Sequence, residues 1–232
     1  MTHSFMFFGK RYRHCFVNNN GAISFGKPMS SYTPDGFPIK GANMICPYWA
    51  DTDVEDIPPQ MTHNPCIYWR QTTEESLRKS VSKDLNSMFE STESHVSIDV
   101  NYLFLATWHR VPYHGSESNR TNTFQCVFAS DKKERSYVMF NYHDINWTTG
   151  TASDGDAHTG LGGIPAQAGF NTEDNYFNMP MSRTEHIINI KSTTNCGIPG
   201  RWVFRVDDFA VPGGCLHKAS TFIIHKNEKK GF

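Results

Sequence analysis

The chain has 232 residues with a net charge of −1, and 38% of its residues are hydrophobic. This composition can form a substantial core for one large domain or two small ones. The balanced charge argues against a nucleic-acid partner held by bulk electrostatics, and no apolar run in the sequence reaches the roughly 18 residues of a membrane-spanning helix.

The N-terminal part of the chain predicts short strands joined by turns. Residues 12–17 and 22–25 alternate between apolar and polar side chains, and the Asn-rich turn between them ends in Gly21. Asn and Gly tolerate positive φ, so this stretch predicts a β-hairpin. Two further strands are predicted at residues 43–49 and 66–70.

One amphipathic helix is predicted over residues 73–90. Thr72 and Glu75 fit a capping box, in which each side chain bonds an otherwise unpaired backbone N–H group. Apolar side chains then recur every four residues and predict a stripe that packs against a sheet. The stripe consists of Leu77, Val81, Leu85 and Phe89.

The remainder of the domain is predicted to be β. The expected strands lie at residues 96–111, 123–130, 136–142, 167–170, 187–190 and 202–206. With the N-terminal strands they number about ten, and this pattern favours a mainly β fold, a β-sandwich covered by the single helix. We place the end of the domain at residue 208 and expect residues 209–232 to form a linker and a poorly ordered basic tail.

The longest predicted connection joins the strands near residues 141 and 171. It is rich in Gly, Thr, Ser, Asp and Asn, and loops of this length are usually functional when they are ordered. Ile145, Trp147 and Leu161 are expected to anchor it to the core. Trp147 also suits a glycan site, where an exposed aromatic ring forms part of the binding surface.

Cysteines and glycosylation sequons favour an extracellular location. The cysteines are at positions 15, 46, 66, 126, 196 and 215. Their spacing does not fit a zinc site, and their even number favours disulfides. We predict a Cys46–Cys66 disulfide because the strands that carry these residues flank one loop. Residues 1–9 lack the pattern of a signal peptide, so we expect an incomplete or alternatively ended chain.

Two sequons, at Asn119 and Asn146, agree with secretion. We expect Asn146 to be a poor glycan acceptor, since a packed Trp147 would hold it close to the scaffold.

No catalytic or cofactor motif is present in the sequence. GxSxG and HExxH are absent. The glycines after residue 155 lead into a predicted strand, whereas a phosphate-binding loop leads into a helix. Asp51, Asp53 and Glu55 place carboxylates at alternate positions, which suit Ca²⁺, and a solvated acidic turn is the alternative. No other cofactor is predicted.

Short motifs follow one another in a fixed order along the chain. They lie at residues 7–13, 17–25, 47–51, 122–125, 140–142, 145–153, 160–163, 166–171 and 199–207. In this order they resemble the nidogen-like (NIDO) domain family, in particular its tectorin-like members, over residues 5–208. The resemblance implies an extracellular domain of matrix or cell-surface proteins that is associated with cell–matrix adhesion and has no catalytic residues.

These observations predict a non-catalytic extracellular interaction module for cell–matrix adhesion. Its expected partners are matrix or cell-surface proteins or glycans, and not nucleic acid. The first alternative is a calcium-assisted glycan-binding module that uses Asp51, Asp53 and Trp147. The second alternative is a secreted hydrolase with an unrecognised site.

Overall fold

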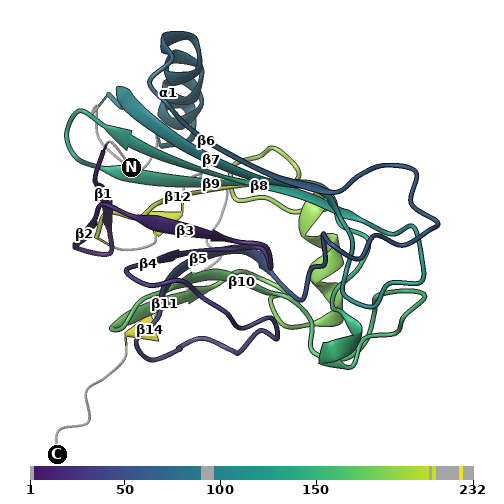
Figure 1. Cartoon of the computed structure of the whole chain (residues 1–232). Coiled ribbons are helices and arrows are strands. Elements are labelled where there is room, and N and C mark those ends of the chain that lie inside the picture. Colours follow the sequence, from purple (N-terminus) through teal and green to yellow (C-terminus); the bar gives the residue numbers. More distant parts are fainter. Residues whose placement is uncertain (1–2, 90–96, 209–210, 213–224, 227–232) are drawn as a thin grey trace, which may run out of the picture.

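A computed structural model describes residues 3–89, 97–208, 211–212 and 225–226, and the fold is a two-layer β-sandwich (Figure 1). The mainly β prediction is confirmed. The strands of both sheets pair antiparallel with their neighbours. A separate two-stranded hairpin, β1 (Phe5–Phe7) and β2 (Lys10–Tyr12), precedes them.

The first sheet has six strands in the order β14-β11-β10-β5-β4-β3. Their bounds in chain order are Cys15–Asn18 for β3, Ala22–Phe25 for β4, Asn43–Trp49 for β5, Gln167–Asn171 for β10, Asn175–Asn178 for β11 and His225–Lys226 for β14. The second sheet also has six strands, in the order β13-β12-β9-β8-β7-β6. Their bounds are Cys66–Thr72 for β6, Val100–Val111 for β7, Asn122–Asp131 for β8, Ser136–Asp144 for β9, Arg201–Arg205 for β12 and Val211–Pro212 for β13.

The predicted N-terminal hairpin is formed by β3 and β4. The Asn18 side chain accepts a hydrogen bond from the backbone N–H of Asn20 at 2.7 Å and stabilises the turn. Gly21 has a φ of +77°, and a Cβ atom at this position would lie 1.9 Å from the carbonyl oxygen of Tyr48. The turn therefore requires glycine for both its backbone conformation and its contact with β5.

Aromatic side chains fill the space between the two sheets. The ring of Phe170 on β10 lies 5.4 Å from that of Phe140 on β9 and 5.1 Å from that of Phe204 on β12. All three side chains are fully buried. Contacts of this kind bury large apolar areas. The two sheets therefore pack tightly where β10 faces β9 and β12.

The helix α1 (Glu75–Phe89) packs against the outer face of the second sheet (Figure 1). Its buried residues Leu85, Met88 and Phe89 belong to a second apolar cluster with sheet residues such as Val127 and Val203. The helix and its apolar stripe are therefore confirmed, although the helix is slightly shorter than predicted.

The predicted capping box is only half formed. Thr72 Oγ1 accepts a hydrogen bond from the N–H of Glu74 at 3.0 Å. The Glu75 carboxylate forms an ion pair with Lys79 at 2.7 Å, which is the neighbour one helical turn further on.

Residues 187–190 are not a strand, which corrects the sequence prediction. They lie in the 3₁₀ helix η2 (Glu185–Ser192), where Ile187 and Ile190 are the buried residues. A spacing of three residues brings side chains to one face of a 3₁₀ helix, and the same residues read as an apolar run in the sequence. A second 3₁₀ helix, η1, spans Thr151–Ser153, and strand β11 was not predicted.

The predicted tail at 209–232 falls mostly outside the described residues. Its described parts, 211–212 and 225–226, are the short end strands β13 and β14. Among the residues that the structure describes, no helix is long and apolar enough to cross a membrane.

Candidate functional site

The long connection between β9 and β10 is an ordered loop, and Trp147 lies near its start. The Trp147 side chain is fully buried. Its Nε1–H donates to the carbonyl oxygen of Val111 at 3.0 Å, and its ring contacts those of Tyr48 and Tyr113 at 6.0 and 5.6 Å between centroids. The prediction that Trp147 anchors the loop is confirmed, and the residue cannot present its ring to a glycan.

Asn122 holds the start of this loop and was not identified from the sequence. Its Oδ1 accepts from the N–H groups of Asn146 and Trp147 at 2.7 and 3.2 Å. Its Nδ2 donates to the carbonyl oxygen of Trp147 at 3.0 Å, and Tyr48 donates to the same oxygen at 2.7 Å. A buried amide whose oxygen and nitrogen both form hydrogen bonds specifies one loop conformation. No local sequence pattern identifies Asn122 as the residue with this role.

The acidic stretch is a structured turn. Asp53 Oδ1 accepts from the N–H groups of Glu55 and Asp56 at 2.9 and 3.0 Å, and its Oδ2 lies 3.2 Å from His114 Nδ1. Partial burial opposes ionisation, but the bonds from these two amides and from His114 lower the pKa of Asp53. Burial raises the pKa of Asp51.

These carboxylates do not gather around one point. Asp51 is buried, whereas Glu55 is exposed, and Asp53 is already engaged. Within the described ranges, no three His, Cys, Asp or Glu side chains form a group that could hold a metal ion. The calcium ligand set Asp51, Asp53 and Glu55 therefore stays a prediction that this geometry disfavours.

The predicted Cys46–Cys66 disulfide is not formed in the structure, where both residues are free thiols. Cys46 is buried on β5 in the middle of the first sheet, and Cys66 begins β6 at the end of the second sheet. The loop between these residues connects the two layers, so strands that flank it in sequence are not neighbours in space.

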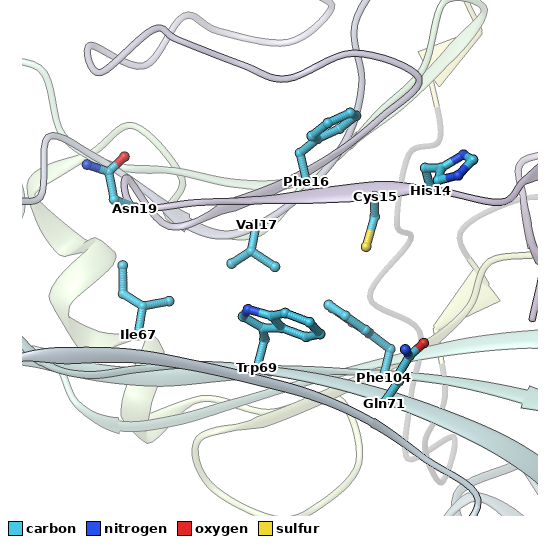
Figure 2. A pocket seen from close by; sticks show the side chains of 9 residues that line it. All are labelled: His14, Cys15, Phe16, Val17, Asn19, Ile67, Trp69, Gln71 and Phe104. Atoms are coloured by element: carbon cyan, nitrogen blue, oxygen red, sulfur yellow. The ribbon is translucent and has the colours of Figure 1, made fainter. Parts of the chain in front are cut away.

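An apolar groove lies between β3 and β6 and encloses about 530 Å³ (Figure 2). These two strands are the end strands of the two sheets, so the groove occupies the open side of the sandwich. Cys15 and Val17 point into it from β3, and Ile67 and Trp69 point into it from β6 (Figure 2).

Trp69 is the most exposed large apolar side chain of this groove. It is 61% exposed, although its ring stacks on that of Phe104 at a centroid distance of 6.3 Å. On the opposite wall, burial raises the pKa of Cys15 from 9.0 to about 11, which keeps this thiol protonated at neutral pH. His14 points away from Cys15 and out of the groove (Figure 2), so the two residues do not form a nucleophile–base pair.

The fold is an all-β sandwich, and its groove between β3 and β6 contains one exposed aromatic ring, that of Trp69. Comparison with models of protein families identifies the family. The model of the nidogen-like domain matches residues 13–208, and the chain belongs to this family.

Relatives of known identity support the assignment. Human alpha-tectorin is 43% identical over 208 residues, which cover 87% of this chain and 9% of alpha-tectorin. Nidogen of Drosophila melanogaster is 29% identical over 204 residues, which cover 86% of this chain and 14% of that protein. The chain thus spans a small part of the length of these relatives. No solved structure matches it significantly.

Proposed function

We propose that this chain is a non-catalytic extracellular module for cell–matrix adhesion and that it binds its partner through the groove between β3 and β6. Its relatives are tectorins and nidogens, which is consistent with an extracellular matrix module. The observation that carries the proposal is Trp69, an aromatic side chain 61% exposed inside a groove. Exposed aromatic residues in pockets are frequent energetic centres of protein interfaces.

Neither alternative has a supporting observation. The glycan-binding hypothesis required Trp147 at the surface, but this residue is buried, and the calcium ligands are not assembled among the residues described. The hydrolase hypothesis required a nucleophile paired with a base. Among the described residues that line the groove, Cys15 is protonated and points away from His14, so these two residues do not form such a pair.

The test measures binding of the 232-residue chain to decellularised matrix and to cultured cells by biolayer interferometry and adhesion assays. Trp69→Ala is expected to weaken binding by roughly tenfold or more, as for an interface hot spot. Tyr68→Ala is the matched control, because Tyr68 is 58% exposed and neighbours Trp69 on the same strand. A wild-type chain that binds neither preparation better than heat-denatured protein would reject the proposed function.

A further inference from the structure

The outer face of the second sheet is apolar under α1 and polar beyond it (Figure 1). The apolar part under the helix includes Leu103 on β7, Val127 on β8, Met139 on β9 and Val203 on β12. Successive side chains of a strand alternate between the two faces of a sheet, so residues at an even separation from these four share their face. On the same four strands these residues are Thr107, Gln125, Asn141 and Arg201.

These four polar residues form one row across the sheet. Thr107 lies directly opposite Gln125 in the strand register, and Asn141 lies between Gln125 and Arg201. Gln125 Nε2 donates to Thr107 Oγ1 at 2.8 Å, and Asn141 Nδ2 donates to Gln125 Oε1 at 3.1 Å. Arg201 Nε donates to Asn141 Oδ1 at 2.9 Å, and its Nη1 donates to Asp84 on α1 at 3.0 Å. The row therefore fixes the orientation of its own side chains.

The two amides of the row can form further hydrogen bonds. An amide oxygen accepts two hydrogen bonds and an amide nitrogen donates two. Within the row, each of these atoms in Gln125 and Asn141 makes one such bond. Both residues are partly exposed. A ligand above the row can therefore meet donors and acceptors whose directions are already set.

A depression of about 440 Å³ lies over the row. All four residues of the row line it, and Ile198 and Pro199 form an apolar part of its wall. At the β6 end of the row, Tyr68 lies opposite Thr107 and is 58% exposed. The row with Tyr68 crosses β6, β7, β8, β9 and β12, which at a spacing of about 4.8 Å per strand gives a length of about 19 Å. The surface is long enough for an extended ligand.

The depression carries almost no charge. Among the described residues that line it, Arg201 is the only Lys, Arg, Asp or Glu, and its guanidinium is paired with Asp84. Polyanions require a group of cationic side chains, so nucleic acid and sulfated polysaccharides fit poorly. The centre of a protein interface is usually apolar and aromatic, whereas the floor of this depression consists of amides and a hydroxyl.

A neutral oligosaccharide matches these properties. Sugar hydroxyls both donate and accept hydrogen bonds, as the amides of Gln125 and Asn141 require. The C–H face of a sugar ring can pack on an exposed aromatic ring such as that of Tyr68, which combines an apolar body with a polar tip. The length of the row suits several linked sugars better than one.

We propose that the outer face of the second sheet, along the row from Tyr68 to Arg201, binds a neutral oligosaccharide. Tyr68 packs against one sugar ring, and Gln125 and Asn141 bond the hydroxyls of the following rings. This site is separate from the groove between β3 and β6, which lies on the other face of β6. It also differs from the calcium-assisted glycan site expected at Asp51, Asp53 and Trp147.

The first experiment measures binding of the 232-residue chain to four neutral tetrasaccharides: maltotetraose, cellotetraose, chitotetraose and lacto-N-neotetraose. A heparin-derived tetrasaccharide is the anionic comparison. At least one neutral tetrasaccharide is expected to bind with a Kd below about 1 mM. Its Kd is expected to change less than twofold between about 0.1 and 1 M salt, because screening acts on charges. Binding of no neutral tetrasaccharide, or tighter binding of the heparin fragment, would overturn the proposal.

The second experiment locates the site with variants. Asn141→Leu is expected to weaken binding of the best tetrasaccharide at least tenfold and Tyr68→Ala several-fold, whereas Tyr68→Phe keeps the ring and changes binding less than twofold. Arg70→Ala is the matched control, because Arg70 is exposed on the same face of β6 outside the row. Thermal unfolding of each variant checks its fold, and the exposed Tyr68 remains informative if Asn141→Leu does not fold.

Nuclear magnetic resonance gives a readout at the amides themselves. The side-chain NH₂ signals of Gln125 and Asn141 are expected to shift when the tetrasaccharide binds, and those of Asn86, which lies on the helix, are expected to stay in place. Binding that is unchanged by both Tyr68→Ala and Asn141→Leu, or that leaves both row amides unshifted, would show that the oligosaccharide binds elsewhere and would overturn the proposed site.

Trp69→Ala separates this site from the proposed function. It is expected to change tetrasaccharide binding less than twofold. Matrix binding is compared on matrix whose glycans have been oxidised with periodate, where Tyr68→Ala serves as the control for Trp69→Ala. Matrix binding that depends on Trp69 without binding of any tetrasaccharide would reject the oligosaccharide site and retain the groove. Tetrasaccharide binding that depends on Tyr68, together with matrix binding unchanged in Trp69→Ala, would do the reverse.

Discussion

At the scale of single residues, glycines decide how closely the loop after β9 lies against the sandwich. Gly160 has a φ of +63°, and a Cβ atom there would lie 2.6 Å from Trp147 Cβ and 2.7 Å from Tyr113 Cε1. Gly162 also has a positive φ, of +84°, but a Cβ atom there would meet nothing within 4 Å. A side chain at Gly162 would therefore add backbone strain alone, whereas a side chain at Gly160 would add both backbone strain and a steric clash.

Gly160→Ala is expected to lower the free energy of unfolding by about 3 kcal/mol, because strain at positive φ adds to overpacking against Trp147. Gly162→Ala, which has only the backbone strain, is expected to cost about 1 kcal/mol. Urea unfolding of both variants measures the difference. Equal losses for the two variants would show that Gly160 is not a packing site.

Glycan occupancy depends on the surroundings of each sequon asparagine. Asn119 is exposed. Asn146 Nδ2 donates to the carbonyl oxygen of Thr121 at 2.8 Å, and the buried Thr148 hydroxyl of its sequon donates to Gly160 at 3.2 Å. We therefore predict a glycan at Asn119 and little or none at Asn146 when the chain is secreted from mammalian cells. Peptide mapping by mass spectrometry measures both sites, and full occupancy at Asn146 would contradict the prediction.

At the scale of elements, Asn86 is one of several helix side chains that bond the helix to β7 or to the residues just before it. Asn86 on α1 donates from Nδ2 to the carbonyl oxygen of Ile98 and accepts at Oδ1 from the N–H of Ile98, both at 2.8 Å. The side chain thereby satisfies both backbone groups of a buried residue just before β7, in the manner of a neighbouring strand.

Asn86→Ala is expected to lower the free energy of unfolding by about 2–3 kcal/mol, because both backbone groups of Ile98 lose their partner. Ser87→Ala is the control: Ser87 is exposed on the same helix, and its replacement is expected to change stability by less than about 0.5 kcal/mol. Chemical denaturation monitored by circular dichroism compares the variants. A loss in Ser87→Ala as large as that in Asn86→Ala would refute this account of the helix.

Secondary structure was predictable where the pattern is local. The β3–β4 hairpin, the amphipathic helix and the β8–β9 hairpin follow from turn residues and from apolar periodicity within each segment. The 3₁₀ helix η2 was missed because Ile187, Ile188 and Ile190 form a short apolar run that a strand would also show. For the candidate sites, sequence analysis predicted that Trp147 packs in the core. It did not predict that Trp69 and Cys15 line the same groove.

At the scale of the whole molecule, buried ionisable groups link stability to alkaline pH. Burial raises the pKa of Cys15 from 9.0 to about 11 and raises the pKa of Cys126 further. Tyr48 and Tyr142 also have raised pKa values through burial. Their hydroxyls donate to the carbonyl oxygens of Trp147 and Pro47, and ionisation would remove these bonds.

The folded state holds these protons to higher pH than the unfolded state. The stabilisation is therefore complete below about pH 9 and declines as the pH rises toward about 11, because the unfolded chain then releases protons first. Urea unfolding under reducing conditions at pH 7, 9 and 10.5 measures the decline. Cys15→Ala should make it shallower, and a free energy of unfolding that is constant up to pH 10.5 would contradict the prediction.

The predicted domain end at residue 208 has a direct test. Among the residues described, all buried apolar side chains lie between Phe5 and Val206. A chain truncated after residue 208 is therefore expected to unfold cooperatively with a Tm within about 3 °C of the full chain, which corresponds to a change of about 1 kcal/mol. Differential scanning calorimetry measures both chains, and a non-cooperative transition in the shorter chain would refute the boundary.

The sequence by itself determined the class of fold, most of the elements and the family, because periodicity, turn residues and ordered motifs are properties of neighbouring positions. Only the tertiary structure decided which of the described strands lie at the ends of the two sheets. β3 and β6 are separated by almost fifty residues, and each becomes an end strand through pairing elsewhere in its sheet. The same long-range pairing buries Trp147 against Val111 and leaves Trp69 exposed, although both tryptophans lie in comparably polar stretches of sequence.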